Sequence, residues 1–388
     1  MAPLPPAAPI GLYAHIPFCS HICPYCDFTT YRGQEPLIPR YVDALVLDIE
    51  RQGRSLDGRP AATLFLGGGT PSLLSPEQIG RVVQAARAGC SLAEDAEATL
   101  EANPNSVDRE YFAGLLAAGV NRLSLGVQTL DRKGLRTLGR QHEAADAEAA
   151  YRAARAAGFA DISLDLIFDW PGQSAESWAR DLDLVLAWPD GGPDHLSLYS
   201  LIVEPGTPMA DAVARGILVP LDDDAAADRY EAAMARMAAA GFVHYEVANW
   251  ARSSEFASKH NTLYWRNGDY LAFGAGAHGH VAGRRTINHL APGRYIAAIG
   301  NGLPPAANTE EISASGQIGE TMMVGLRLLL EGIGGREFAA RHGVTLEAAF
   351  GPTIAELERL GLLRRDRDAL LLTPRGLMVA NDVCARFL

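Results

Sequence analysis

Short apolar runs alternate with longer segments of helical periodicity from about residue 10 to residue 202. The runs predict strands at 11–16, 63–66, 98–102, 122–127, 162–167 and 195–201, and the segments between them predict helices at 38–54, 76–88, 109–118, 144–157 and 175–188. Repeated strand–helix alternation is typical of parallel βαβ units. We therefore predict an α/β fold, a partial (β/α)6 barrel of the TIM type, with its chemistry at the carboxyl ends of the strands.

The pattern changes after the segment E-P-G-T at residues 204–207. We expect a helix at 223–240, a strand at 243–247, and then a stretch rich in glycine and aromatic residues. The C-terminal part predicts helices at 318–330, 335–342, 346–360 and 376–387, and a hairpin at 362–372. The predicted units are therefore a flexible N-terminus (1–9), a barrel (10–210), an extension (211–310) and a small helical, winged-helix-like domain (311–388).

Composition restricts the partners. The chain of 388 residues contains 34 Lys and Arg against 46 Asp and Glu, a net charge of −12. Nucleic acids and anionic membranes bind concentrated basic surfaces, so we expect no nucleic-acid partner. No apolar run is long enough to span a membrane, and we find no secretory signal. These features predict a soluble, cytoplasmic protein.

Three of the five cysteines, Cys19, Cys23 and Cys26, lie within eight residues of one another after the first predicted strand. A disulfide framework would spread its cysteines along the chain. Three thiolates on one loop can instead hold three corners of a [4Fe–4S] cluster and leave the fourth iron open. The amino and carboxylate groups of S-adenosylmethionine (SAM) can chelate an open iron, and an electron from the cluster can then cleave a carbon–sulfur bond of SAM to release a 5′-deoxyadenosyl radical.

Other interpretations of the cysteines remain open at this stage. A structural zinc ion usually takes four ligands, and His15 or His21 can supply the fourth. A redox pair of the thioredoxin type uses C-x2-C but leaves Cys19 unexplained. Inert core cysteines would require three such residues on one polar loop that contains proline.

Polar and glycine residues cluster where the predicted strands end. The loop after the second strand reads G-G-G-T-P-S and contains Gly68, Gly69 and Thr70, and glycines let a ligand approach the backbone closely. Other strand ends and following loops contribute Glu101, Gln128, Arg140 and Asp165. A zwitterionic cofactor that carries adenosine needs a carboxylate, an arginine and polar acceptors of this kind. Each residue alone is equally well explained as a helix cap or a loop hydrogen bond.

The spacing C-x3-C-x2-C, with Tyr25 before the last cysteine, resembles the radical SAM signature. The surrounding Y-x-H-I-P-F-C is similar to the branch that contains oxygen-independent coproporphyrinogen III dehydrogenase (HemN) and the heme chaperone HemW, and the resemblance extends from Tyr13 to the C-terminus. It implies a [4Fe–4S] cluster on the three cysteines. It also implies a SAM site formed by Tyr13, Gly68, Gly69, Thr70, Glu101, Gln128, Arg140 and Asp165. The segment D-W-P-G at 169–172 departs from the Gly-Leu that often precedes Pro-Gly in relatives.

Three features favour the chaperone branch over the dehydrogenase. Phe28 stands where the dehydrogenase has a further cysteine, and only about a dozen residues precede Tyr13. The segment H-N-T-L-Y-W at 260–265 matches H-N-x-x-Y-W, a motif associated with heme binding in the HemW-like branch. The resemblance thus implies that His260 is a heme ligand, and His278 and His142 are competing candidates. Aromatic faces for the macrocycle would come from Tyr264, Trp265, Tyr270 and Phe273.

The sequence therefore predicts a heme chaperone that passes heme to an acceptor, such as a respiratory hemoprotein, with SAM and the cluster supporting transfer and dimerisation. The alternative is an oxygen-independent coproporphyrinogen III oxidase, which would use radical hydrogen abstraction to decarboxylate propionate groups. The alternative for His260 is a hydrogen-bonded structural residue in a glycine-rich loop, with Tyr264 and Trp265 as ordinary core residues.

Overall fold

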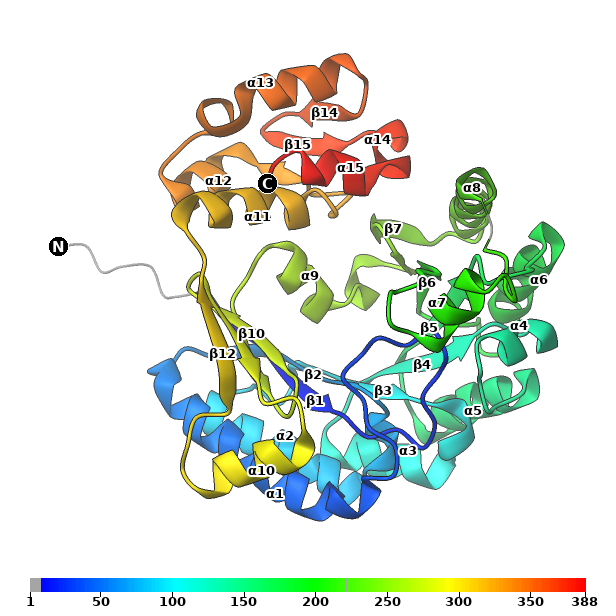
Figure 1. Cartoon of the computed structure of the whole chain (residues 1–388), viewed down its shortest axis with the longest axis vertical. Helices are drawn as coiled ribbons and strands as arrows, with labels where there is room; N and C mark the ends of the chain where they lie inside the picture. The colour runs from blue at the N-terminus through cyan, green and yellow to red at the C-terminus, as the bar shows by residue number, and fades with distance from the viewer. Residues whose placement is uncertain (1–7, 221) are drawn as a thin grey trace.

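Six parallel strands form the centre of the protein, whose computed structural model describes residues 8–220 and 222–388. The strands follow one another in the sheet in chain order (Figure 1). They are β1 (Ile10–Ile16), β2 (Ala61–Gly68), β3 (Glu97–Ala102), β4 (Arg122–Gln128), β5 (Asp161–Phe168) and β6 (His195–Ser200). Each lies where the apolar runs predict a strand. The sheet is open, because β1 and β6 pair with other strands instead of with each other, and the predicted α/β fold class is confirmed.

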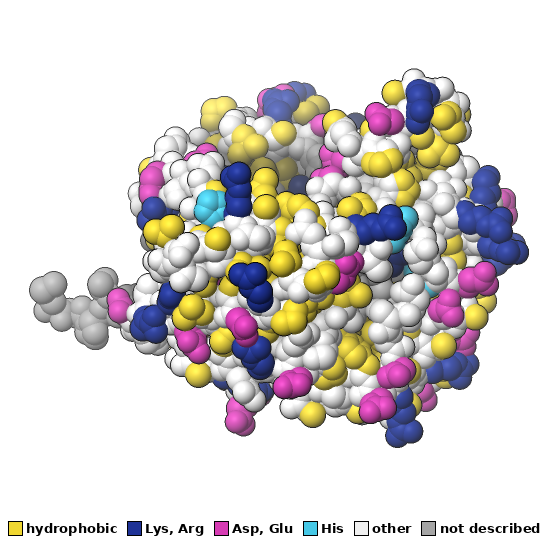
Figure 2. Space-filling view, turned by 60° about the horizontal axis from the view of Figure 1, so that its bottom comes forward, with side chains coloured by type: hydrophobic (Ala, Val, Ile, Leu, Met, Phe, Trp, Pro, Cys, Tyr) yellow, Lys and Arg dark blue, Asp and Glu magenta, His cyan; other side chains and the backbone are white. Residues whose placement is uncertain are grey.

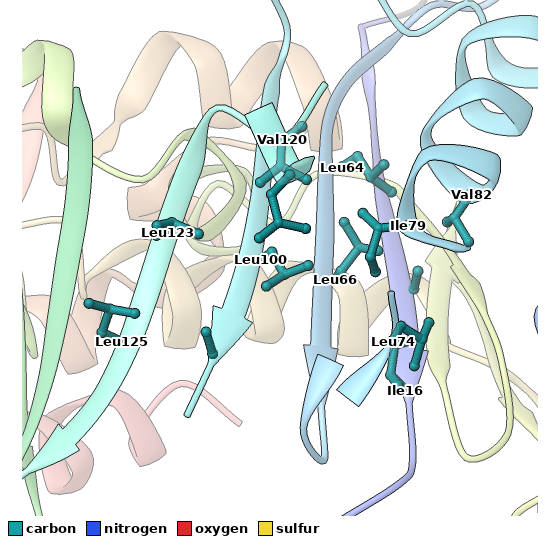
Figure 3. Close-up of a cluster of buried hydrophobic side chains, with 14 of the residues drawn as sticks. Ile16, Leu64, Leu66, Leu74, Ile79, Val82, Leu100, Val120, Leu123 and Leu125 are labelled. Carbon is teal, nitrogen blue, oxygen red and sulfur yellow. The ribbon is translucent and has the colours of Figure 1, made fainter. Parts of the chain in front are cut away.

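The outer face of this sheet is covered by helices (Figure 1). They are α1 (Ile38–Gly53), α2 (Pro76–Cys90), α3 (Arg109–Ala118), the short α4 (Arg132–Thr137), α5 (Ala144–Ala157) and α6 (Ala175–Leu186). Alternate strand residues face these helices, since successive side chains of a strand point to opposite faces. Figure 3 shows Leu64 and Leu66 of β2 near Ile79 and Val82 of α2, and all four side chains are fully buried. Burial of such alternating apolar residues holds the helices against the sheet.

The inner face of the same strands carries mostly polar and aromatic side chains. Thr63 and Phe65 alternate with the buried leucines of β2, and Glu101, Ser124 and Asp165 occupy the inward positions near the ends of β3, β4 and β5. Several of these side chains are only half-buried, so the inner face borders a hollow instead of a packed apolar core. Helix α9 (Lys259–Trp265) lies over this face on the side of β2.

Further strands extend the sheet to twelve (Figure 1). Beyond β1 lie β9 (Tyr270–Phe273), β10 (His278–Val281), β11 (Arg284–Asn288) and β12 (Ala306–Glu311), and beyond β6 lie β8 (Asn249–Ala251) and β7 (Val243–Glu246). The remaining helices of this region are α7 (Pro208–Ala214), α8 (Asp223–Ala239) and α10 (Pro292–Gly300). The strand predicted at 243–247 is present. The sequence pattern did not predict the four strands between Tyr270 and Glu311.

The C-terminal residues form a separate layer at the top of the molecule in Figure 1, with a hydrophobic cluster of its own. Its elements are α11 (Ala314–Gly325), β13 (Ile333–Gly334), α12 (Gly335–His342), α13 (Leu346–Arg359), β14 (Leu363–Asp366), β15 (Ala369–Leu372), α14 (Pro374–Met378) and α15 (Ala380–Ala385). Two predictions here are wrong in their bounds. The helix predicted at 318–330 ends at Gly325, because Leu328 pairs with Glu246 and the Leu329 N–H donates to the Tyr245 carbonyl. The helix predicted at 376–387 is divided at Val379, whose φ of −124° is not helical.

On the face shown in Figure 2, basic and acidic side chains are interspersed. Among the described residues, no helix is long and apolar enough to cross a bilayer. The predicted flexible N-terminus falls mostly on residues 1–7, which lie outside the described part of the chain.

Asp169, the first residue of the segment D-W-P-G at 169–172, is held in place by two neighbouring side chains. Asp169 follows β5 with a φ of 63°, a backbone region that glycine adopts freely and Asp tolerates. Its carboxylate accepts a hydrogen bond from Ser200 (2.8 Å) and lies 3.8 Å from the guanidinium of Arg229 on α8. Asp169 therefore joins the end of β5 to α8 through a buried ion pair.

The first prediction concerns the core between β2 and α2. Leu66→Ala is expected to lower the free energy of unfolding by about 3 kcal/mol, because the cavity it leaves cannot collapse fully. The matched control is Leu184→Ala on α6, where the leucine is 45% exposed, and a change below about 0.5 kcal/mol is expected. Denaturant unfolding followed by circular dichroism measures both values. Equal losses for the two variants would contradict this account of the core.

Candidate functional site

A cavity of about 480 Å³ opens at the carboxyl ends of the parallel strands. It brings together ten of the twelve site residues predicted from the sequence. They are Cys19, Cys23, Cys26, Gly68, Gly69, Thr70, Glu101, Gln128, Arg140 and Asp165. The other two, Tyr13 and His260, lie outside the cavity wall. The parallel register explains the convergence, since equivalent ends of neighbouring strands meet at one edge of the sheet.

The loop that carries the cysteines is fastened to the end of β1. The Cys19 N–H donates to the Tyr31 carbonyl (3.0 Å), and the Cys26 N–H donates to the Cys23 carbonyl (3.1 Å). The Nε2–H of His15 donates to the Thr29 carbonyl (2.9 Å), and its Nδ1 accepts from the Tyr13 hydroxyl (2.9 Å). Both ring nitrogens of His15 are thus occupied, which removes His15 as the fourth ligand of a zinc ion. His21 lines the cavity.

Burial disfavours the ionised form of the thiols. It raises the pKa of Cys19 above its usual value and the pKa of Cys26 to about 11. Nη1 of Arg140 donates to Sγ of Cys23 (3.6 Å). Within residues 8–220 and 222–388, no three His, Cys, Asp or Glu side chains converge as the ligands of one metal ion would. The three cysteine thiols are compatible with an iron–sulfur cluster, because in such a cluster each thiolate binds a different iron. Cluster binding would release protons from the buried thiols.

The glycine loop approaches the cysteine loop too closely for any side chain. A Cβ on Gly69 would lie 2.7 Å from the Phe18 carbonyl oxygen and 3.1 Å from Sγ of Cys19. Gly68 has a φ of 111°, and a Cβ there would lie 2.4 Å from the ring of His15. The N–H groups of Gly68, Gly69 and Thr70 donate to Glu101, Ile16 and Phe18. Because these N–H groups already have acceptors, a ligand at this loop would meet backbone carbonyl oxygens. Carbonyl oxygens are suited to accept hydrogen bonds from an ammonium group.

Two carboxylates face the cavity, Glu101 on β3 and Asp165 on β5, and β4 lies between these two strands. Burial and the nearby Asp165 raise the pKa of Glu101 to about 7, and its Oε2 accepts from the Gly68 N–H (3.0 Å). Burial also raises the pKa of Asp165, which accepts from the Ser124 hydroxyl (2.7 Å). A cation in the cavity would relieve the mutual repulsion of these groups. The pair therefore favours a positively charged ligand.

Arg140 supplies the opposite charge. Its Nη2 donates to the Gly126 carbonyl (2.9 Å) and also to Asn103, whereas its buried Nε has no hydrogen-bond partner in the described structure. An unpaired buried donor is costly and indicates a missing acceptor. Gln128 ends β4 after a register shift with a φ of 67°, an uncommon conformation for a residue with a side chain. Sequence reasoning missed Asn103 and Ser124, although both stand in the same segments as predicted residues.

Tyr13 lies on the inner face of β1, beside the cavity. Its ring is half-buried and stacks on Phe65 with centroids 6.3 Å apart, and burial raises the pKa of its hydroxyl well above the usual value. The hydroxyl donates to His15. In this arrangement Tyr13 positions the ring that holds the cysteine loop.

His260 belongs to α9, is buried, and has both of its ring nitrogens hydrogen-bonded. Nδ1 pairs with the Thr63 hydroxyl (2.7 Å), and Nε2 pairs with the Tyr264 hydroxyl (2.8 Å). Burial lowers the pKa of His260 to about 3, so the ring is neutral. The ring also stacks on Phe65 with centroids 5.2 Å apart. This geometry is that of a structural histidine, and a metal could be bound only after one hydrogen bond is broken.

The other predicted heme contacts are distributed unevenly. Phe273 is fully buried in the core, whereas Tyr264 and Tyr270 are half-buried and make an edge-to-face contact with centroids 4.5 Å apart. His142 lines the cavity, but it is 3% exposed and its Nε2 donates to the Val127 carbonyl (3.1 Å). His278 begins β10 and is exposed.

Comparison with known proteins places this geometry in context. The radical SAM superfamily matches residues 13–185, and the HemN C-terminal domain matches residues 312–379. The chain is 37% identical to the heme chaperone HemW of Bacillus subtilis, covering 97% of this chain and 98% of that protein. It is 36% identical to the HemW of Escherichia coli K12, covering 98% of both chains. It is also 36% identical to the mitochondrial radical S-adenosyl methionine domain-containing protein 1 of Bos taurus, covering 98% and 88%.

A solved structure shares the fold. Coproporphyrinogen III oxidase (HemN) from Escherichia coli superposes with a TM-score of 0.83, covering 98% of this chain and 90% of that one, at 23% sequence identity. At this identity the likeness establishes the architecture alone.

The second prediction follows from the raised pKa of Glu101. Between the ordinary Glu pKa and about 7, the folded protein keeps a proton that the unfolded chain loses. Glu101 therefore makes folding less favourable as the pH rises through this window. In Glu101→Gln this contribution is absent, so the stability of the variant relative to wild type should increase as the pH rises from about 5 to about 7.

Denaturant unfolding of the cofactor-free protein at a series of pH values measures this difference. The control is Glu94→Gln, an exposed position before β3, where no such trend is expected. A difference that stays constant for Glu101→Gln would show that this carboxyl does not hold an elevated pKa.

Proposed function

The chain belongs to the HemW family of radical SAM proteins, and we propose from this that it is a heme chaperone, which binds heme and transfers it to an acceptor hemoprotein. The observation that carries the proposal is the likeness, over almost the entire chain, to proteins named heme chaperone HemW. Phe28 supports it from within the chain. It stands where the dehydrogenase has a further cysteine, and its ring is 66% exposed at the cavity mouth.

Membership of the radical SAM superfamily implies a [4Fe–4S] cluster and SAM. We propose that Cys19, Cys23 and Cys26 hold the cluster, since these three thiols line one cavity and no other cysteine lies on it. When bound, the cluster supplies an electron to the cofactor beside it. The role of the chain's own residues is to hold the thiols in place, through the contacts of His15 with Thr29 and of Cys19 with Thr70.

The SAM site is proposed to be divided by charge. Glu101 and Asp165 would attract the cationic groups of SAM, and the unpaired Nε of Arg140 would donate to its carboxylate. The remaining proposed contacts are Tyr13, Gly68, Gly69, Thr70 and Gln128. The glycines admit the ligand by their lack of side chains, and Tyr13 would act from the adjacent inner face.

Heme is the proposed cargo, and a respiratory hemoprotein is the proposed acceptor. Transfer is proposed to occur in the cytoplasm, where a reducing environment keeps the cluster thiols from forming disulfides, and with the chaperone as a homodimer. His260 as the heme ligand stays a prediction. It requires the imidazole to give up its bond with Thr63 or Tyr264.

The third prediction tests the cluster assignment. Replacing Cys19, Cys23 or Cys26 singly by Ala is expected to abolish the cluster, because the donor set cannot spare a thiolate. Cys90→Ala and Cys384→Ala are matched controls, since both cysteines are buried in helices elsewhere, and these variants should retain the cluster. Iron and sulfide content and the absorption spectrum after anaerobic reconstitution give the result. A cluster that survives all three loop substitutions would disprove the assignment.

The fourth prediction separates the chaperone from the oxidase. Anaerobically reconstituted protein is expected to bind heme, and to form no protoporphyrinogen from coproporphyrinogen III with SAM and a reductant. Heme titration followed by absorption, and chromatography of the porphyrins, measure the two activities. A known oxygen-independent oxidase serves as the positive control for turnover. Product formation without stable heme binding would replace the proposed function by the oxidase.

A further inference from the structure

Two of the three thiols proposed to hold the cluster are in contact with polar side chains from other parts of the barrel. Sγ of Cys19 lies 3.4 Å from the hydroxyl oxygen of Thr70, which follows β2. Sγ of Cys23 accepts from Nη1 of Arg140 (3.6 Å), which follows α4. Hydrogen bonds to the sulfur atoms of an iron–sulfur cluster help to set its reduction potential. These two contacts are therefore placed where they can affect a redox property of the site.

Asn103 connects the two contacts. Its side-chain Nδ2 donates to the hydroxyl oxygen of Thr70 (3.2 Å), and its Oδ1 accepts from Nη2 of Arg140. Arg140 fixes the orientation of this amide, because a guanidinium has donors only and must face the amide oxygen. The NH2 group of Asn103 is thus the part that faces Thr70.

This amide determines where the hydroxyl hydrogen of Thr70 points. A hydroxyl has one hydrogen and two lone pairs. The oxygen of Thr70 accepts from Asn103, which leaves its hydrogen to donate to Cys19. A cysteine that ligates iron is a thiolate and has no proton to donate. The hydrogen bonds therefore run in one direction, from Arg140 through Asn103 and Thr70 to the sulfur of Cys19.

The backbone holds Thr70 at this distance from the sulfur. Its N–H donates to the carbonyl of Phe18 (2.8 Å), the residue before Cys19. The preceding Gly69 lets the two loops approach, since a Cβ there would lie 3.1 Å from Sγ of Cys19. Thr70 is 5% exposed, so little water can compete for its hydroxyl. The contact is thus part of the folded barrel and does not depend on a mobile side chain.

We propose that Thr70, oriented by Asn103 and Arg140, donates a hydrogen bond to the Cys19 thiolate and thereby raises the reduction potential of the cluster. This assignment rests on the proposed cluster site. Reduction adds one electron from an external donor to the cluster, and no bond forms or breaks. The added negative charge is shared by the sulfur atoms, so a donor stabilises the reduced form more than the oxidised form. This role of Thr70 is separate from its proposed contact with SAM and does not require SAM.

The test measures the midpoint potential of the cluster in full-length, anaerobically reconstituted protein without SAM. Titration with dithionite, followed by electron paramagnetic resonance of the reduced cluster, gives this value. Thr70→Val and Thr70→Ala both remove the hydroxyl, and each is expected to make reduction less favourable by on the order of tenfold, a shift of about 59 mV to more negative potential for one electron. Thr70→Ser keeps the hydroxyl and should behave as wild type.

Ser72→Ala is the matched control. Ser72 lies in the same loop and is 4% exposed. Its hydroxyl accepts from the Asn103 N–H (3.2 Å) and lies 3.0 Å from the hydroxyl of Ser106, and among the described residues it contacts no thiol. Its removal should leave the potential unchanged. Iron and sulfide content is measured for every variant, so that a shifted potential is not confused with a lost cluster.

Asn103→Asp tests the direction of the hydrogen bonds. The carboxylate has acceptors only, so the hydroxyl of Thr70 is expected to turn toward it and away from Cys19. Thr70→Val should therefore change the potential much less in the Asn103→Asp background than in the wild-type protein. The new negative charge is present in both members of this comparison and cancels.

An unchanged potential in Thr70→Val and Thr70→Ala overturns the assignment, and so does an equal shift in Thr70→Ser or Ser72→Ala. A full-sized effect of Thr70→Val in the Asn103→Asp background also overturns it. If neither Thr70→Val nor Thr70→Ala holds a cluster while Thr70→Ser does, Thr70 is needed for assembly instead, and the assignment is again wrong. All these results leave the proposed cluster site intact, whereas wild-type protein without a cluster refutes that site.

Discussion

The two faces of the six parallel strands have opposite chemistry, and the rest of the structure depends on this division. On the outer face, apolar side chains such as Leu64 and Leu66 are fully buried against helices, which fixes the position of every strand. On the inner face, polar side chains gather at the carboxyl ends of the strands, where Glu101 of β3, Ser124 of β4 and Asp165 of β5 come together. Because each strand is held from outside, its inner side chains need not pack a core. The hollow and its unpaired charges are therefore tolerated.

The cavity without ligand is electrostatically unfavourable in a consistent way. Glu101 is held partly neutral by burial and by Asp165, Arg140 has a buried donor without a partner, and burial of Cys26 opposes ionisation of its thiol. A cation would relieve the cost at Glu101, an anion the cost at Arg140, and a metal the cost at Cys26. A zwitterion beside an iron cluster satisfies all of them together. The polar groups that lack partners thus make the cavity specific for such a ligand, and they lower the stability of the protein when no ligand is bound.

The parts of this arrangement that repeat locally could be predicted from sequence. Apolar runs of strand length identified β1 to β6, and the cysteine spacing identified the loop after β1. The short strands between Tyr270 and Glu311 could not be predicted, because glycine and polar residues interrupt their periodicity and their pairing is supplied by neighbours. The end of α11 at Gly325 depends on a bond from Leu329 to Tyr245. The environment of His260 depends on Thr63, which is 197 residues away in the chain, so composition and motif alone could not separate a ligand from a structural residue.

Helix α9 connects the barrel to the C-terminal layer, and this affects the interpretation of the H-N-x-x-Y-W segment. The carboxylate of Glu97, on the same strand as Glu101, accepts from the N–H groups of Lys259 and His260 at the start of α9. Just beyond its end, the side chain of Asn267 donates to Thr321 of the C-terminal layer (3.0 Å). A substitution at His260 therefore disturbs a joint between the barrel and that layer. Loss of heme in such a variant would not by itself identify an iron ligand, since the helix that carries Tyr264 would also have lost its anchor.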